Sequence, residues 1–247
     1  MNDELMTIEE KLARARSNES VDFSKYQSSD QKDSLVRVES AERLLVEPCW
    51  TLDNDWEGQR YRDYMSLHPE YDAIYLRSEL AKRLLVAANH LDSRYKLVLR
   101  AGHRPIDVQR KILIDCADDY KKDNPQVSDE EALEHAREFV SDPETTLPPH
   151  VCGAAVDVDM IDTTTGKLVD FGSKLNDDTE KSYLFCEELT DTQKSNRLIL
   201  LTAMLQAGLA SCMVEWWHYS YGDQLWAWFY GKENSLYSLI DLDPMHS

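Results

Sequence analysis

The sequence lacks any long apolar run. No stretch approaches the ~18 consecutive apolar residues from which a membrane-spanning helix is built. The amino-terminal segment also contains no apolar run of about 7 to 15 residues, which is the hydrophobic part of a signal peptide. These two absences predict a protein that has no membrane partner and carries no export signal.

Cysteine is scarce, and its spacing is irregular. The 5 cysteines are odd in number, and no two of them form a Cys-x-x-Cys pair. A disulfide framework and a zinc ribbon both need closely and regularly spaced cysteines, so neither is expected. Because reduced thiols are typical of the cytosol, we expect a cytoplasmic protein.

Positive charge is in deficit. The chain has 27 Lys and Arg against 46 Asp and Glu, a formal net charge of −19. Such a chain repels phosphate, which argues against nucleic acid and anionic membranes as partners. The remaining composition, 42% apolar and 30% charged over 247 residues, is that of a globular domain with a sizeable core.

The character of the chain changes near residue 40. Residues 1–40 are polar and charge-dense, and we expect a short helix there, followed by a mobile linker over residues 17–34. Residues 41–247 contain no internal repeat and no low-complexity tract. We therefore predict a polar amino-terminal extension, 1–40, and one folded domain, 41–247.

Helices and strands are predicted from apolar periodicity and from capping residues. Ser78 is the expected N-cap of one helix, and Ser128 with Glu131 has the spacing of a capping box. The expected helices are 77–93, 105–123, 128–142 and 191–208; the expected strands are 95–102, 151–162 with a hairpin return over 163–172, and 210–220. The predicted fold class is α+β, a small, mainly antiparallel sheet flanked by helices.

Polar residues that are costly to bury without partners occur at three places. His150 and Asp157 are separated by small residues, which let the backbone approach a common point closely. Glu215 and His218 bracket two tryptophans near the end of a predicted strand, and Arg104 lies on the turn after another strand. We expect these side chains to converge.

Together they are the residue types of a catalytic zinc site. Zinc binds imidazole nitrogen and carboxylate oxygen, and a catalytic site keeps one position for water. His150, Asp157 and His218 would be the ligands, Glu215 would accept the proton of the attacking water, and Arg104 would stabilise the oxyanion. Two further side chains compete for the ligand role: Asp159 lies on the same strand face as Asp157, and Cys152 is close to His150, although a buried structural thiol is the favoured interpretation of Cys152.

These segments resemble the zinc D-alanyl-D-alanine dipeptidases of the VanX type, within the D-Ala-D-Ala carboxypeptidase and Hedgehog-like fold group. The family motif Ser-x-His-x-x-Gly-x-Ala-x-Asp stands here as PPHVCGAAVD, and Glu-x-x-His stands as EWWH. An Arg-Pro turn (AGHRP), the segment DNDWEGQRY and the hairpin TGKLVDFGSKLND also match, in order, over roughly residues 50 to 230. The resemblance favours Asp157 over Asp159 as the ligand.

The resemblance implies one Zn²⁺ per chain at the centre of the sheet, bound by His150, Asp157 and His218. It implies Glu215 as general base and acid, Arg104 as the stabiliser of the transition state, and hydrolysis of D-Ala-D-Ala to free D-alanine. Trp216 and Trp217 are expected to form a dry wall beside the site, with Trp217 contacting the substrate.

The sequence departs from the family pattern at two positions. Pro148 replaces the serine that precedes the first histidine, and Asn176 stands where an aspartate usually takes the substrate's amino group. A neutral amide holds an ammonium less strongly than a carboxylate does, so Asp177 is the expected substitute. These departures motivate one alternative, a D,D- or L,D-carboxypeptidase acting on longer peptidoglycan peptides. A second alternative is a non-catalytic zinc-binding module of the same fold, because the resemblance extends to Hedgehog-like folds that carry zinc. The sequence leaves the oligomeric state and the physiological role undetermined; wall recycling, D-alanine catabolism and glycopeptide resistance use the same chemistry.

Overall fold

The structure is a computed structural model that describes residues 6–17, 21–51, 56–177 and 179–242, with the side chains of 56–59 excepted. Its helices are α1 (Ile8–Ala15), α2 (Trp56–Met65), α3 (Ser78–His90), α4 (Ile106–Asp123), α5 (Asp129–Phe139), α6 (Asp191–Gln206) and α7 (Gln224–Phe229). Its strands are β1 (Leu35–Arg37), β2 (Leu44–Val46), β3 (Tyr75–Arg77), β4 (Tyr95–Ala101), β5 (Ala155–Asp162), β6 (Lys167–Leu168), β7 (Ala210–Ser211) and β8 (His218–Ser220).

The main sheet has the strand order β2-β4-β5-β8-β7, and β6 pairs with the far end of β5. Only β2 and β4 run parallel in this sheet; the other neighbours are antiparallel. A second, two-stranded sheet pairs β1 with β3. The predicted α+β class with a mainly antiparallel sheet is confirmed, and β5 is its central strand.

Alternation along β5 separates an apolar face from a polar face. Val156, Val158 and Met160 are fully buried in the core cluster, while Asp157 and Asp159 lie between them and point to the opposite face. The register supports this division, because Met160 lies opposite an apolar residue of β4 and Asp157 lies opposite His218 of β8. The site residues therefore share the face that the core does not use.

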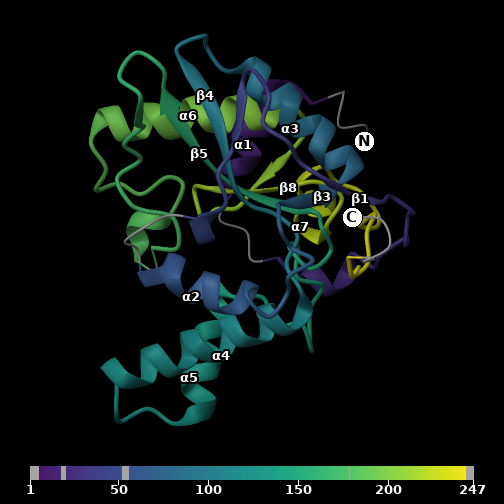
Figure 1. The fold of residues 1–247 in the computed structure, drawn as a ribbon, viewed down its shortest axis with the longest axis vertical. Coiled ribbons are helices and arrows are strands. Elements are labelled where there is room, and N and C mark those ends of the chain that lie inside the picture. Colours follow the sequence, from purple (N-terminus) through teal and green to yellow (C-terminus); the bar gives the residue numbers. More distant parts are fainter. Residues whose placement is uncertain (1–5, 18–20, 52–55, 178, 243–247) are drawn as a thin grey trace.

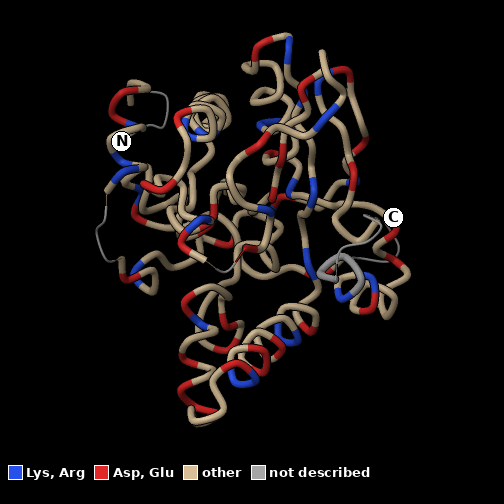
Figure 2. The backbone as a smooth tube through the Cα atoms, turned by 90° about the vertical axis from the view of Figure 1, so that its left-hand side faces the viewer, with Lys and Arg blue, Asp and Glu red and all other residues tan. Residues whose placement is uncertain are grey.

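Helices α3 and α6 pack against each other and cover the apolar face of the sheet, and α1 packs against α6 (Figure 1). Helices α4 and α5 form an antiparallel hairpin that projects from the body beside α2, with a small apolar cluster of its own (Figure 1). Figure 2 shows acidic residues spread along the whole chain, including this hairpin, and interspersed with Lys and Arg. No described helix is both long and apolar enough to cross a membrane.

Several expected boundaries are confirmed. The capping box of Ser128 and Glu131 is present at the start of α5, and α6 ends just before Gly208, whose φ is +78°. Gly166 has φ +69° in the turn that leads into β6, as the hairpin prediction requires. A short helix, α1, lies within residues 1–40, as expected.

Three expectations are wrong in detail. Ser78 does not cap its helix; Arg77 is the N-cap residue, and the carboxylate of Asp33 accepts from the Glu79 amide instead. The linker expected over 17–34 is packed where it is described: the Ser29 amide donates to Ser235, and the Gln31 amide donates to Leu236. The third error concerns the single strand expected over 210–220.

That segment forms a hairpin, not one strand. β7 and β8 pair with each other in antiparallel fashion, and residues 212–217 make the turn between them. The turn is closed by a hydrogen bond from the His218 amide to the Glu215 carbonyl, 3.2 Å long. This turn could not be recognised in the sequence, because its residues are mostly apolar and both of its tryptophans are buried.

Candidate metal centre

The three expected ligands converge on one point. His150, Asp157 and His218 are buried, and one ligand atom from each lies within 4.8 Å of the others. Nε2 of His150 lies 3.4 Å from one carboxylate oxygen of Asp157, and Nδ1 of His218 lies 3.2 Å from the other. The two imidazole rings meet edge to face, with their centroids 5.0 Å apart.

Local structure explains how residues that are distant in sequence meet. Asp157 on β5 and His218 on β8 are direct cross-strand partners, so their side chains project from the same face. His150 lies on the turn before β5, where the Gly153 amide donates to the His150 carbonyl and Gly153 adopts φ +66°. This tight turn brings the imidazole back over the strand that carries Asp157.

Backbone contacts orient the first histidine. Nδ1 of His150 lies 2.8 Å from the Gly102 carbonyl, which can only accept a hydrogen bond. Nδ1 therefore carries the proton, and the lone pair of Nε2 faces Asp157. A metal-binding histidine takes this form, with its second nitrogen held by a carbonyl or carboxylate. Two nitrogens and a carboxylate oxygen form the donor set that zinc prefers.

The charges in the cluster are strongly coupled. Burial lowers the pKa of His150, so it favours the neutral imidazole that ligates metals. Burial opposes the ionisation of Asp157, but the two histidines outweigh it and hold the pKa of this carboxyl well below its usual range. Burial likewise opposes the charged form of His218, but the hydrogen bond and charge of Asp157 raise its pKa.

Glu215 lies beside the ligands without joining the cluster of three. The turn that it shares with His218 places its carboxylate 3.7 Å from Nδ1 of that histidine. Burial raises the pKa of Glu215 to about 7, although the positive fields of His218 and Arg104 oppose the rise. A carboxylate with a pKa near neutrality, next to a metal site, is suited to accept and return a proton.

Arg104 lies on the other side of the site, at the turn that links β4 to α4. Its amide donates to the His150 carbonyl, and its Nη1 donates to Oε1 of Gln109 over 2.7 Å. Its guanidinium lies 5.4 Å from the ring centroid of Tyr61, and its buried Nε has no hydrogen-bond partner among the described residues. That Nε–H is an unused donor in the part of the chain that the structure describes.

The tryptophans form a packed wall. Trp216 and Trp217 are 2% and 1% exposed and meet edge to face, with centroids 5.5 Å apart. Trp216 stacks on Phe171 at 4.1 Å and donates from Nε1 to the Ser173 hydroxyl. Because Trp217 is almost entirely buried, its contact with a substrate stays a prediction.

The two candidate anchors for an amino group lie on the loop after β6. Asn176 is exposed and adopts φ +59°, and the half-buried Asp177 accepts hydrogen bonds from the amide and hydroxyl of Thr179. Asp177 therefore has a structural function in its own turn. The DNDWEGQRY segment contributes α2, but its first three residues, 53–55, lie outside the described part of the chain.

The competing ligands are set apart from the cluster. Asp159 points to the same face as Asp157 but lies beside Arg100, at 3.8 Å, and burial raises its pKa to about 6. Cys152 is 1% exposed in the core, and burial raises the pKa of its thiol to about 12. Tyr61, whose ring faces Arg104, was not identified from the sequence, because no spacing links α2 to the Arg-Pro turn.

Comparisons with known proteins show which family the chain is similar to. A profile of the peptidase family M15, described as D-Ala-D-Ala dipeptidase, matches residues 66–236, more than half of the chain. A D-alanyl-D-alanine dipeptidase from Synechocystis is 37% identical over 100 residues, 36% of this chain and 40% of that protein. One from Enterococcus faecalis is 27% identical over 138 residues, 53% of this chain and 64% of that protein.

Each alignment thus covers less than two thirds of the relative's length. Among solved structures, the vancomycin-resistance D,D-pentapeptidase VanY, in complex with Zn(II), superposes with a TM-score of 0.40 at 15% identity. That superposition covers 66% of this chain and 83% of VanY.

Proposed function

The chain belongs to the D-Ala-D-Ala dipeptidase family, and from this premise we propose that it is a zinc-dependent D,D-dipeptidase. The proposed reaction is hydrolysis of D-Ala-D-Ala to two molecules of D-alanine. The observation that carries the proposal is the buried cluster of His150, Asp157 and His218 with Glu215 beside it. No two of the described cysteines form a disulfide, which supports the cytoplasm as the place of action.

The residues present fit a zinc ion. Nε2 of His150 and Nδ1 of His218 both face the carboxylate of Asp157, and the Gly102 carbonyl fixes the tautomer of His150. These three side chains would hold the metal. When bound, zinc supplies a Lewis acid that activates water at neutral pH and polarises a carbonyl.

Glu215 performs the proton transfers in this proposal. Its carboxylate takes a proton from the attacking water as the water oxygen bonds to the carbonyl carbon of the peptide. The same carboxyl group then gives that proton to the leaving nitrogen as the C–N bond breaks, which releases two molecules of D-alanine. The two buried tryptophans that follow Glu215 in the chain provide an apolar surrounding, which strengthens each electrostatic interaction in the site.

Arg104 provides positive charge where negative charge develops. Its buried Nε–H has no hydrogen-bond partner among the described residues. A donor that is free in the resting site and engaged in the transition state lowers the barrier selectively. The hydrogen bond to Gln109 holds the other end of the guanidinium in place.

The alternative substrate class is a longer peptide that ends in D-Ala-D-Ala. Two departures favour testing it: Pro148 offers no hydroxyl, and the carboxylate of Asp177 is already engaged with Thr179. A dipeptidase must hold a free amino group close to the scissile bond, whereas a carboxypeptidase must leave that side open.

The first experiment measures release of D-alanine by the purified protein, with and without a chelator. D-Ala-D-Ala, L-Ala-L-Ala and a pentapeptide ending in D-Ala-D-Ala are compared at equal concentration. Chelator-sensitive cleavage of the D,D-dipeptide alone is the expected result. Faster cleavage of the pentapeptide would establish the carboxypeptidase instead, and cleavage of neither D,D substrate would refute both.

Glu215→Gln distinguishes an enzyme from a zinc-binding module. The amide cannot accept the proton, so we expect kcat to fall by a factor of about 100 or more. Zinc content, measured by atomic spectroscopy, should equal that of the wild type. Arg104→Ala should also lower kcat while zinc remains bound. Loss of zinc from the Glu215 variant would contradict the assigned roles.

A further inference from the structure

A buried arginine on α6 lies behind the segment that carries Glu215. Arg197 is 2% exposed, and its guanidinium donates to three backbone carbonyls of the loop between β6 and α6. Nε donates to Phe171 over 2.8 Å, Nη2 donates to Lys181 over 2.6 Å, and Nη1 donates to Tyr183. One side chain thus contacts both end regions of the loop 171–184.

This loop in turn holds the turn between β7 and β8. The Trp216 amide donates to the Ser182 carbonyl over 3.0 Å, and the Ser182 hydroxyl donates to the Val214 carbonyl over 2.6 Å. The Leu184 amide donates to the Met213 carbonyl. Glu215 lies between Val214 and Trp216, so the loop fixes the backbone on both sides of it.

Side chains reinforce the same connection. Phe171, whose carbonyl accepts from Arg197, stacks on the indole of Trp216, and Ser173 accepts from the indole nitrogen. The guanidinium itself lies 5.7 Å from the indole centroid. A shift of the loop would therefore move the residue next to Glu215 through both backbone and ring contacts.

We propose that Arg197 is a positioning residue, which sets the place of the Glu215 carboxylate through the loop 171–184 without touching substrate or metal. The inference rests on the proposed function, because it assigns a catalytic consequence to the position of Glu215. A planar guanidinium reaches three carbonyls that lie in different directions, whereas a lysine ammonium at the end of a flexible chain cannot reproduce that geometry.

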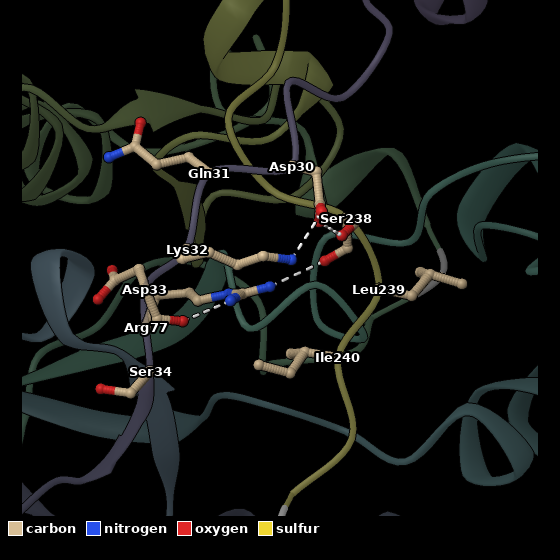
Figure 3. A pocket seen from close by; sticks show the side chains of 9 residues that line it. All are labelled: Asp30, Gln31, Lys32, Asp33, Ser34, Arg77, Ser238, Leu239 and Ile240. Carbon is tan, nitrogen blue, oxygen red and sulfur yellow. Dashed lines mark hydrogen bonds and ion pairs between the residues drawn. The ribbon is translucent and has the colours of Figure 1, made fainter.

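A second buried arginine, Arg77, makes a similar set of hydrogen bonds near the first expected ligand. Arg77 is also buried, and it donates to the carbonyls of Cys152, Asp33 and Ser238. Figure 3 shows its guanidinium reaching the last two at a pocket formed by the segments 30–34 and 238–240. Its amide also donates to Gly153, so Arg77 holds the turn that carries the first ligand, His150, and not Glu215.

Arg197→Lys and Arg77→Lys therefore form a matched pair. The first readout is hydrogen exchange of single amides in the zinc-loaded protein. In Arg197→Lys we expect the Trp216 and Leu184 amides to exchange at least about tenfold faster, the factor for about one lost hydrogen bond. In Arg77→Lys these two amides should match the wild type, while the Ile240 amide, bonded to Val151, should exchange faster.

The second readout is turnover of D-Ala-D-Ala. In Arg197→Lys we expect kcat to fall about 10- to 100-fold with zinc content within a factor of about two of the wild type, because the base is displaced and none of the three expected metal ligands lies on the loop. In Arg77→Lys the dissociation constant of zinc should rise instead. Ser182→Ala removes the hydroxyl that donates to the Val214 carbonyl. It should lower kcat as Arg197→Lys does, but by a smaller factor. It also tests the proposal if the Arg197 variant does not fold.

Unchanged exchange of the Trp216 amide in both Arg197→Lys and Ser182→Ala would overturn the proposal. Faster exchange with unchanged kcat would also overturn it, since Arg197 would then be a structural residue alone. A fall in kcat that follows loss of zinc would assign Arg197 to the metal and not to the base. A wild-type protein that does not cleave the dipeptide would refute the proposed function, and the amides alone would then decide whether Arg197 holds the Glu215 segment.

Discussion

Acid should destabilise this protein through one buried histidine, His103, which precedes Arg104. His103 is only 4% exposed, and its ring stacks on Tyr71. Nδ1 lies 2.7 Å from the Tyr71 hydroxyl, and Nε2 lies 2.7 Å from the Ile240 carbonyl. The neutral ring satisfies both contacts, with Nε2–H donating to the carbonyl and Nδ1 accepting from the hydroxyl.

Burial lowers the pKa of His103 from 6.5 to about 4. Below pH 6.5 the unfolded chain therefore binds a proton that the folded chain does not, so the free energy of unfolding falls as the pH falls. At about 1.4 kcal/mol per pKa unit, the loss between pH 6.5 and pH 4 is about 3 kcal/mol. Above pH 6.5 this contribution does not change with pH.

The assay is urea unfolding of the metal-free protein at a series of pH values between 7.5 and about 4, compared with His103→Gln. The glutamine amide can donate and accept but does not titrate, so the difference between the two proteins should shrink by about 3 kcal/mol across this range. His90→Gln, at an exposed position on α3, is the control and should run parallel to the wild type. Parallel curves for His103→Gln and the wild type would refute the reasoning.

Two further predictions concern the stability of the fold. Gly208→Ala should lower the thermal midpoint more than Gly166→Ala does, although both glycines have positive φ, which costs about 1 kcal/mol for alanine. At Gly208 the new Cβ would also lie 2.4 Å from Nη1 of Arg83 and displace it from its hydrogen bond to the Ala207 carbonyl. Equal midpoints would contradict this account. Asp33→Ala should destabilise by about 2 kcal/mol in urea unfolding, because the carboxylate accepts from Ser78, the Glu79 amide and Tyr237; a change within about 0.5 kcal/mol would show that the first turn of α3 does not need this cap.

The sequence predicts which side chains converge at the candidate site better than it predicts the backbone around them. Alternation along 155–162 is enough to place Asp157 and Asp159 on one face, and the register of β5 with β8 then brings His218 to Asp157. The hairpin over 210–220 could not be predicted, because its turn contains buried tryptophans where turns usually carry Gly, Asn or Asp. The cap of α3 was missed for a different reason: Asp33 lies 45 residues before Ser78 and caps the helix through a tertiary contact.

The contacts that orient the site share one property that hides them from sequence analysis. The Gly102 carbonyl orients His150, and backbone carbonyls accept every hydrogen bond described for Arg77 and Arg197. Every residue carries such a carbonyl, so these acceptors cannot be recognised in the sequence. A motif indicates which side chains are candidates for the chemistry. Their positions also depend on backbone carbonyls that the fold brings close to them. Variants of Arg77 and Arg197 therefore test a part of the proposed mechanism that motif residues alone cannot reach.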